Sequence, residues 1–230
     1  MKHFFLRAPW ALAPLALAPL ALSACIGPFA RTAPYAYDKK GDLVEFNYAW
    51  SAEASADRTL ARRMRLDLER SFKAAEATAM ADRAQATVAN RPFRAHRYNR
   101  RWTTAGQSAR LLSLDGRLQT FTGDDRPSEG ADVLLWDRRT RSEVAPASIF
   151  TSNEALDRLL RVPTCNRDRE GCPPFFANTL VLTDNNRNRR FDHVRFAVRG
   201  GKDIVVPISA TLLAAIKPTY RSSFEVAQPQ

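Results

Sequence analysis

Hydrophobic and polar residues alternate in the first clearly patterned stretch of the chain, residues 42–50. The apolar positions are Val44, Phe46, Tyr48 and Trp50. A period of two predicts a strand with one buried face. Over residues 57–88 the apolar spacing changes to three or four, at Leu60, Met64, Leu68, Phe72, Ala75 and Ala79. This spacing predicts an amphipathic helix, capped by Asp57, whose apolar stripe packs on a sheet.

From Phe93 onward the period of two returns. Strands are predicted at 93–104, 109–122, 131–137, 178–183, 193–198 and 202–207. Within the second of these segments, Asp115-Gly116 is typical of a two-residue hairpin turn. Short helices are predicted at 151–161 and 209–217. Strands joined by tight turns, with helices inserted among them, predict an α+β fold: an antiparallel sheet packed by one long and two short helices.

The chain begins with the pattern of an export signal. Lys2 and Arg7 precede an apolar run that Pro14 and Pro19 interrupt, and small residues follow. The run is short for a helix that crosses a bilayer, so residues 1–24 are predicted to be a secretory signal peptide.

The tetrapeptide LSAC at residues 22–25 resembles the bacterial lipobox. The resemblance implies that Cys25 becomes the mature N-terminus and carries acyl chains, which together anchor the protein stably in a membrane. The alternative is an ordinary cleaved signal followed by an unrelated cysteine. The residue after this cysteine is Ile26 and not Asp, and in this the chain resembles lipoproteins of the outer membrane, not the inner membrane, of Gram-negative bacteria. The expected location is therefore the periplasmic face of the outer membrane.

A basic surface is expected after export, because the formal net charge of +11 falls only to +9 when Lys2 and Arg7 are removed. Such a charge would favour nucleic acid as a partner, but export excludes it. The remaining partners are anionic envelope materials, such as peptidoglycan carboxylates and lipid head groups. The alternative is that the arginines only solvate the surface.

Two further cysteines, Cys165 and Cys172, flank a short polar loop. In an exported chain such a pair predicts a disulfide. A zinc site would need two more ligands, and neither His96 nor His193 has a second ligand nearby in the sequence. We therefore expect no metal at the cysteines and no cofactor.

The segment at residues 183–192, TDNNRNRRFD, has oxygen donors at the spacing of a calcium loop. These are Asp184, Asn186, Asn188 and Asp192. Arg189 and Arg195, however, stand where such a loop needs glycine and glutamate. Because Asn and Asp also favour turns, and strands are predicted on both sides, the hairpin loop is the preferred interpretation and calcium the alternative.

The sharpest binding candidate is the strand predicted at residues 93–104. One face would carry Arg94, His96, Tyr98, Arg100 and Trp102. Cations interleaved with aromatic rings suit a carbohydrate that bears carboxylates, or an acidic protein surface. The alternative is an edge strand whose solvated arginines discourage aggregation.

Several segments resemble a known family of envelope proteins. Residues 134–150, 172–198 and 205–224 resemble the extracytoplasmic domain of the anti-sigma factor RsiV, and residues 46–50 and 110–123 are similar to the companion domain found in the peptidoglycan deacetylase PdaC. Members of this family are mostly uncharacterised, and the better-known one binds lysozyme. The resemblance implies a binding module and no enzyme activity.

The sequence thus predicts a signal peptide at 1–24, a lipidated cysteine and tether at 25–41, a PdaC-like part at 42–105 and an RsiV-like part at 106–230, or one continuous domain from residue 42. The expected function is non-catalytic binding of peptidoglycan-type glycan or of an envelope-directed protein such as lysozyme. The alternatives are an accessory structural lipoprotein and a cell-wall hydrolase, although no nucleophile-elbow, zinc-protease or phosphate-loop motif occurs in the sequence.

Overall fold

The computed structural model describes residues 32–123, 126–152, 180–196 and 203–228. These residues lie within one compact unit, Arg31–Gln230, and the fold class is α+β as predicted. The predicted signal peptide, Cys25, the pair Cys165 and Cys172, and nearly all of the helix predicted at 151–161 lie outside the described residues.

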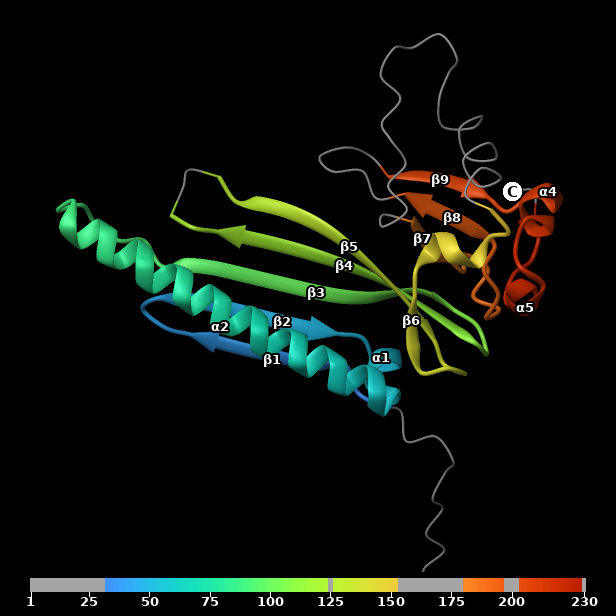
Figure 1. Ribbon diagram of the computed structural model, residues 1–230, viewed down its shortest axis with the longest axis horizontal. Helices are drawn as coiled ribbons and strands as arrows, with labels where there is room; N and C mark the ends of the chain where they lie inside the picture. The colour runs from blue at the N-terminus through green and yellow to red at the C-terminus, as the bar shows by residue number, and fades with distance from the viewer. Residues whose placement is uncertain (1–31, 124–125, 153–179, 197–202, 229–230) are drawn as a thin grey trace, which may run out of the picture. The chain divides into compact units, whose positions relative to one another are not determined.

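The larger sheet has six strands that follow one another in chain order (Figure 1). They are β1 (Tyr35–Lys40), β2 (Val44–Trp50), β3 (His96–Gln107), β4 (Leu111–Phe121), β5 (Ser128–Asp137) and β6 (Ser142–Val144). Every neighbouring pair is antiparallel except β2 and β3, which are parallel. The predicted antiparallel sheet is therefore present with one exception, the parallel pair β2 and β3, which makes the larger sheet mixed.

The long helix α2 (Arg58–Val88) explains the parallel pair. A parallel neighbour requires the chain to return to the start of the strand, and 31 helical residues span about 46 Å, which is ample for that return. Asp57 caps the helix as predicted, because its side chain accepts hydrogen bonds from the backbone N–H groups of Thr59 and Leu60. A five-residue helix, α1 (Ala52–Ala56), which the sequence analysis missed, precedes it.

One face of the large sheet packs against the apolar stripe of α2. Leu60, Met64 and Leu68 are buried as predicted. They form a core with residues of β2 to β5, which include Phe46, Tyr48, Trp50, Trp102, Leu112, Leu114, Leu134 and Trp136. Aromatic side chains dominate this core, and Phe46 stacks on Tyr98 with ring centroids 4.7 Å apart.

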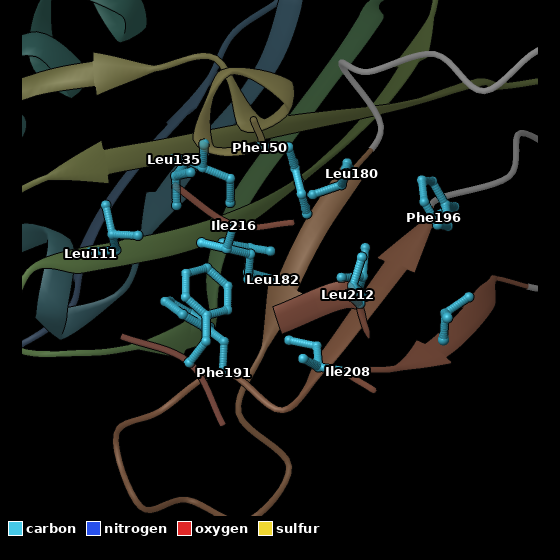
Figure 2. Close-up of a cluster of buried hydrophobic side chains, with 14 residues drawn as sticks. Leu111, Leu135, Phe150, Leu180, Leu182, Phe191, Phe196, Ile208, Leu212 and Ile216 are labelled. Carbon is cyan, nitrogen blue, oxygen red and sulfur yellow. The ribbon is translucent and has the colours of Figure 1, made fainter. Parts of the chain in front are cut away.

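The opposite face of β4 and β5 packs against a second, three-stranded antiparallel sheet. Its strands are β7 (Leu180–Thr183), β8 (His193–Phe196) and β9 (Ile204–Pro207). Short elements complete this core: η1 (Pro146–Ile149), α4 (Ala210–Ala214) and α5 (Pro218–Arg221). Figure 2 shows side chains from both sheets, among them Leu111, Leu135 and Leu182, gathered in one cluster.

The start of the described chain differs from the predicted tether. Residues 35–40 form β1, an edge strand that pairs in full register with β2. Tyr35 stacks on Trp50 with ring centroids 4.0 Å apart, and Tyr37 packs edge-on against Phe46. The alternation of Tyr35 and Tyr37 was the available signal, but Ala, Pro and charged residues around them obscured it.

Asp115-Gly116 is not a hairpin turn, contrary to the prediction. Both residues lie in the middle of β4, where Gly116 pairs with Trp102 of β3. A Cβ atom at position 116 would lie 2.7 Å from the Trp102 ring. The glycine is therefore required because the indole lies against its backbone.

We expect Gly116→Ala to destabilise the protein by about 1–3 kcal/mol, since the added methyl group overfills a closed contact with Trp102. Gly130→Ala is the matched control, because a Cβ atom in that β5 position meets Leu118 at an ordinary 3.7 Å. Urea unfolding of both variants measures the difference. Equal midpoints for the two variants would contradict the packing role of Gly116.

Candidate functional site

The structure buries part of the binding face that the sequence predicts on β3. His96 is 4% exposed and Trp102 is 6% exposed, and both lie on the side of the sheet that α2 covers. Of the five residues predicted to share this face, only Arg94 is exposed, and Tyr98 and Arg100 are half-buried. Ligand binding by this face stays a prediction. The period of two defines which residues share a face, but the buried side is decided by the helix that packs there.

The five predicted residues separate toward two cavities. Arg100 and Trp102 line a cleft between α2 and strand β5, whereas Arg94 and His96 line a second cavity beside the last turns of α2. Tyr98 lies between them and is stacked on Phe46. The predicted set is therefore not one site.

The cleft has a volume of about 210 Å³. Its lining residues are Arg63, Met64, Asp67, Arg70, Arg100, Trp102, Asp132, Val133, Leu134 and Glu143. Three arginines and three carboxylates surround an apolar floor. Opposed charges at one concave surface suit a polar ligand that carries both acceptors and donors.

A chain of hydrogen bonds fixes the inner wall of the cleft. The Trp102 indole Nε1 donates to the Tyr48 hydroxyl at 3.0 Å, and that hydroxyl donates to Asp67 Oδ2 at 2.6 Å. Burial raises the pKa of Tyr48 well above its ordinary value, and the hydrogen bond to Asp67 raises it further. Tyr48 therefore stays protonated and acts as a positioning group for Asp67 and Trp102.

Arg100 forms the side of the cleft nearest the sheet. Its guanidinium pairs with Asp132 and lies over the Trp102 ring, 4.8 Å from the ring centroid. Burial opposes the charge of Arg100, but hydrogen bonding to Tyr98 and the charge of Asp132 outweigh it, so the pKa of Arg100 is raised. This cation is fixed in place.

Arg63 and Arg70, one turn of α2 on either side of Asp67, form the mouth of the cleft. Arg63 pairs with Glu143, and both side chains are partly exposed. The side chain of Arg70 is 76% exposed, and its Nη2 atom lies 3.7 Å from Asp67 Oδ1, beyond hydrogen-bond length. Arg70 Nε donates to the carbonyl of Leu66 at 3.3 Å. The terminal Nη groups of Arg70 make no hydrogen bond with a described residue, so they remain available to a ligand.

Sequence reasoning missed the helix side of this cleft. Arg63, Asp67 and Arg70 recur four and three positions apart along α2, next to the apolar stripe. That spacing was the available signal. It was overlooked because charged residues beside an apolar stripe are usually solvated. Only the neighbouring strands β3, β5 and β6 make these helix residues one side of a cleft.

The second cavity, of about 350 Å³, is lined by His96, Asp82, Arg91, Arg94 and neighbouring residues. His96 Nε2 lies 3.1 Å from Asp82 Oδ2. Arg94 bonds the carbonyl of Gly123 and stacks over Phe121. Arg94 is thereby engaged within the protein. His96 Nε2 is buried next to Asp82 but forms no hydrogen bond of good geometry with a described residue.

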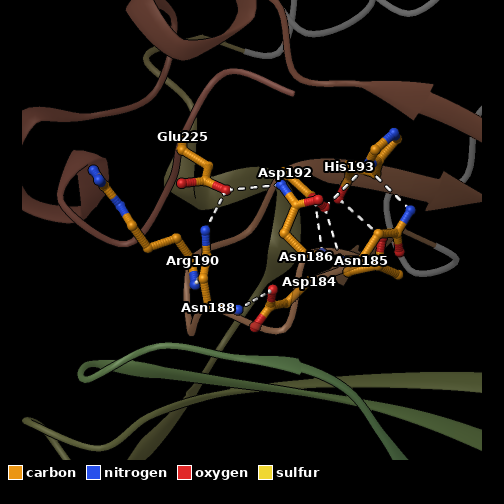
Figure 3. Close-up of polar contacts among 9 residues, drawn as sticks. Asp184, Asn185, Asn186, Asn188, Arg190, Asp192, His193 and Glu225 are labelled. Carbon is orange, nitrogen blue, oxygen red and sulfur yellow. Dashed lines mark hydrogen bonds and ion pairs between the residues drawn. The ribbon is translucent and has the colours of Figure 1, made fainter. Parts of the chain in front are cut away.

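The loop between β7 and β8 is held by its own side chains (Figure 3). Asp184 accepts hydrogen bonds from the backbone N–H groups of Asn188 and Arg189, at 3.1 and 2.8 Å. Asp192, which is fully buried, accepts the N–H groups of Asn185 and Asn186. The predicted hairpin loop is therefore confirmed.

The remaining donors of this loop close onto the C-terminal segment. The side-chain amides of Asn186 and Asn188 both donate to Glu225 Oε1, at 3.1 and 2.6 Å. In the calcium alternative Asp184, Asn186, Asn188 and Asp192 would face one ion. In the described residues no three His, Cys, Asp or Glu side chains are placed to hold a metal.

No described helix is both long and apolar enough to cross a membrane. This includes α2, the longest of them.

No protein-family model matches this chain, and no curated protein matches it. Among solved structures, it is similar to a DUF3298 family protein from Pseudomonas aeruginosa, with 14% identity and a TM-score of 0.46 over 80% of this chain and 94% of that one. It is also similar to a DUF3298 family member from Bacteroides fragilis, with 10% identity and a TM-score of 0.48 over 83% and 95% of the two chains.

We expect Tyr48→Phe to destabilise the protein by about 1–3 kcal/mol near neutral pH, because Trp102 Nε1 loses its acceptor inside the core. The raised pKa of Tyr48 makes this contribution fully present below the ordinary value of 10.0 and lost as the pH rises above it. The difference between wild type and variant should therefore shrink above pH 10.0. Chemical unfolding at several pH values measures it.

Tyr37→Phe is the matched control for this measurement. Tyr37 packs against the same aromatic core, but its hydroxyl has no hydrogen bond to a described residue. It should change the unfolding free energy little at any pH. A similar loss in both variants would assign the effect to general packing and contradict the role of the Tyr48 hydroxyl.

We expect millimolar calcium to leave the melting temperature unchanged, because Asp184 and Asp192 already accept backbone hydrogen bonds within the loop. Differential scanning fluorimetry with calcium and with a chelator tests this. A rise in melting temperature that Asp184→Asn abolishes would restore the calcium interpretation.

Proposed function

We propose that this chain is a lipid-anchored binding module of the bacterial envelope, and that its cleft binds an acidic glycan of the peptidoglycan type without chemical turnover. The observation that carries the proposal is the combination at one mouth of the exposed guanidinium of Arg70, which forms only a long ion pair with Asp67, with the accessible carboxylates of Asp132 and Glu143. An acidic sugar presents a carboxylate to the first and hydroxyl groups to the others.

Arg70 supports the recognition of the ligand carboxylate. A guanidinium presents parallel N–H donors that match the two oxygens of a carboxylate. Asp67 engages them only at long range, because its Oδ2 is held by Tyr48 and its Oδ1 lies 3.7 Å from Arg70 Nη2. Arg63 is the second available donor, since its exposed pair with Glu143 contributes little stability and exchanges readily.

Asp132 and Glu143 support the recognition of sugar hydroxyls. Each bonds one arginine and keeps further acceptor capacity toward solvent. A volume of about 210 Å³ is below the range of drug-sized pockets, so the cleft suits one sugar unit or the end of a chain. The apolar floor at Met64 and Trp102 complements the face of a sugar ring.

A cell-wall hydrolase is the second candidate, because the cleft brings together three carboxylates, the residue type that glycoside hydrolysis uses. That reaction needs one carboxyl group to donate a proton to the leaving oxygen. Here Asp67 accepts from Tyr48, Asp132 from Arg100 and Glu143 from Arg63. This arrangement supports binding over proton donation.

The sequence supports the placement in the envelope. Cys25 in a lipobox-like tetrapeptide is the proposed anchor, on the periplasmic face of the outer membrane. The resemblance to the RsiV and PdaC domains points to the same class of module. An envelope-directed protein such as lysozyme is the alternative ligand, and an accessory role in an envelope assembly is the alternative function.

The test is co-sedimentation with purified peptidoglycan sacculi, from low to high salt, using the full chain with Cys25→Ser so that no acyl chain contributes. We expect binding that persists at high salt. Arg63→Gln with Arg70→Gln should weaken it at least about tenfold, because two charge-assisted hydrogen bonds are lost.

The matched control is Arg83→Gln with Arg101→Gln, which removes the same charge from two exposed arginines outside the cleft. Control and cleft variants with equal losses would show that only net charge matters. Turnover of the sacculi that Asp132→Asn abolishes would favour the hydrolase instead.

A further inference from the structure

Two loops at one end of the large sheet carry an unusual density of exposed arginines. The turn between β5 and β6 and the loop between β7 and β8 contribute Arg139, Arg141, Arg187, Arg189 and Arg190, which we call the arginine end. None of these five guanidinium groups has a hydrogen bond or ion pair with a described residue. The arginine end is therefore a surface of cations that form no direct pair with a carboxylate of the described residues.

The acidic residues of the same loops are engaged internally. Asp184 and Asp192 accept backbone N–H groups of their own loop, and Glu225 accepts two asparagine amides. Asp137, at the base of the other loop, is fully buried and pairs with Arg110. These carboxylates keep their charge, but their oxygens bind backbone and amide groups and none pairs directly with a guanidinium of the arginine end.

The two loops are held close to one another. A Cβ atom on Gly106 of β3 would lie 2.8 Å from the backbone nitrogen of Asp184, so the second loop lies directly against the end of that strand. Arg138, which begins the other loop, donates to the carbonyl of Ser108 at 2.6 Å and to Gln107 at 2.9 Å. Burial lowers the pKa of Arg138, and the nearby charge of Arg189 lowers it further.

The backbone of these loops is held in the conformation that exposes the arginines. Arg141, Arg187 and Arg189 have φ values of 52, 56 and 67°, the left-handed region that residues with a Cβ seldom adopt. Such conformations persist where surrounding bonds determine them, as the Asp184 and Asp192 bonds do for the second loop. A cation on a fixed loop loses little freedom when it meets an anion.

The chain enters the fold at this same end. Tyr35, the first residue of β1, pairs with Trp50, and Ser51 bonds Thr104 of β3 at 2.7 Å. Thr104 lies three residues before Gln107, which holds Arg138. Cys25 precedes Tyr35 by ten residues, a segment that reaches at most about 35 Å.

We propose that the arginine end docks on the phosphate head groups of the membrane in which Cys25 is anchored. This rests on the anchor of the proposed function, but not on the cleft. A tether of that reach keeps the arginine end near the lipid head groups. Arginines close to an anionic membrane surface are attracted to it, and salt screens this attraction beyond about one Debye length, roughly 8 Å. Docking would also fix which way the cleft faces.

The experiment measures co-sedimentation with phosphatidylcholine vesicles, with and without phosphatidylglycerol. All proteins are full chains with Cys25→Ser, so any contribution of the leader is common to them. We expect binding that requires phosphatidylglycerol. Arg187→Asn with Arg190→Gln should weaken it roughly fivefold for each arginine removed. Asn is used at position 187 because it tolerates positive φ.

Two matched proteins of equal charge make the result specific. The cleft variant, Arg63→Gln with Arg70→Gln, and the control, Arg83→Gln with Arg101→Gln, should both keep most of their vesicle binding. If the arginine-end variant binds vesicles like the control, the proposal is overturned.

The two proposals fail separately. If the arginine-end variant loses its binding to sacculi and keeps its binding to vesicles, the arginine end binds glycan and the proposal of membrane docking is wrong. If the cleft variant keeps its binding to sacculi while the arginine-end variant loses its binding to vesicles, the proposal that the cleft binds glycan is wrong and the proposal of membrane docking stands.

Discussion

Burial of strand β4 on both faces is the constraint on which the rest of the structure depends. Residues 111–116 are all buried, and they alternate between two cores. Leu112 and Leu114 face α2, whereas Leu111 faces the three-stranded sheet. A strand in this position cannot shift by one residue without exchanging its two sets of side chains. The register of the six-stranded sheet, and with it the cleft beneath α2, follows from this strand.

The polar residues of β4 connect the two sheets. Ser113 accepts a hydrogen bond from the backbone of Leu182, and Asp115 pairs with Arg195 of β8. Burial opposes the charge of Arg195, but its bonds to Asp115 and Asp203 outweigh this and raise its pKa. These directional bonds specify one arrangement of the second sheet, whereas apolar packing alone would permit several. The loop between β7 and β8 is thereby fixed beside the end of β3.

The sequence predicted the elements better than their arrangement. The period of two and the period near 3.6 located β2, β3, β5, β7 to β9 and α2, because burial of one face or stripe leaves a direct record in the pattern. Asp115-Gly116 misled because turn chemistry and close packing both select glycine, and only the Trp102 ring opposite reveals which applies. The parallel pairing of β2 and β3 depends on where a long helix returns the chain, which no local pattern records. Of the cleft residues, the sequence predicted only Arg100 and Trp102. The other side of the cleft is the polar border of α2, and such a border is typical of a solvated helix surface when the helix is considered alone.

The parallel pair also has a consequence for how the chain reaches its native state. The strands β1 and β2 come first in the chain and can form a hairpin at once, since only Gly41 to Leu43 separate them. Their aromatic face, with Tyr35, Tyr37, Phe46 and Trp50, stays uncovered until α2 has formed and β3 has closed over a separation of about fifty residues. Until then an exposed hydrophobic surface and an unpaired strand edge can associate with other chains. An N-terminal third that folds before β3 pairs with it would favour aggregation, so the early arrival of β3, or a chaperone that covers β1 and β2, would protect the folding chain.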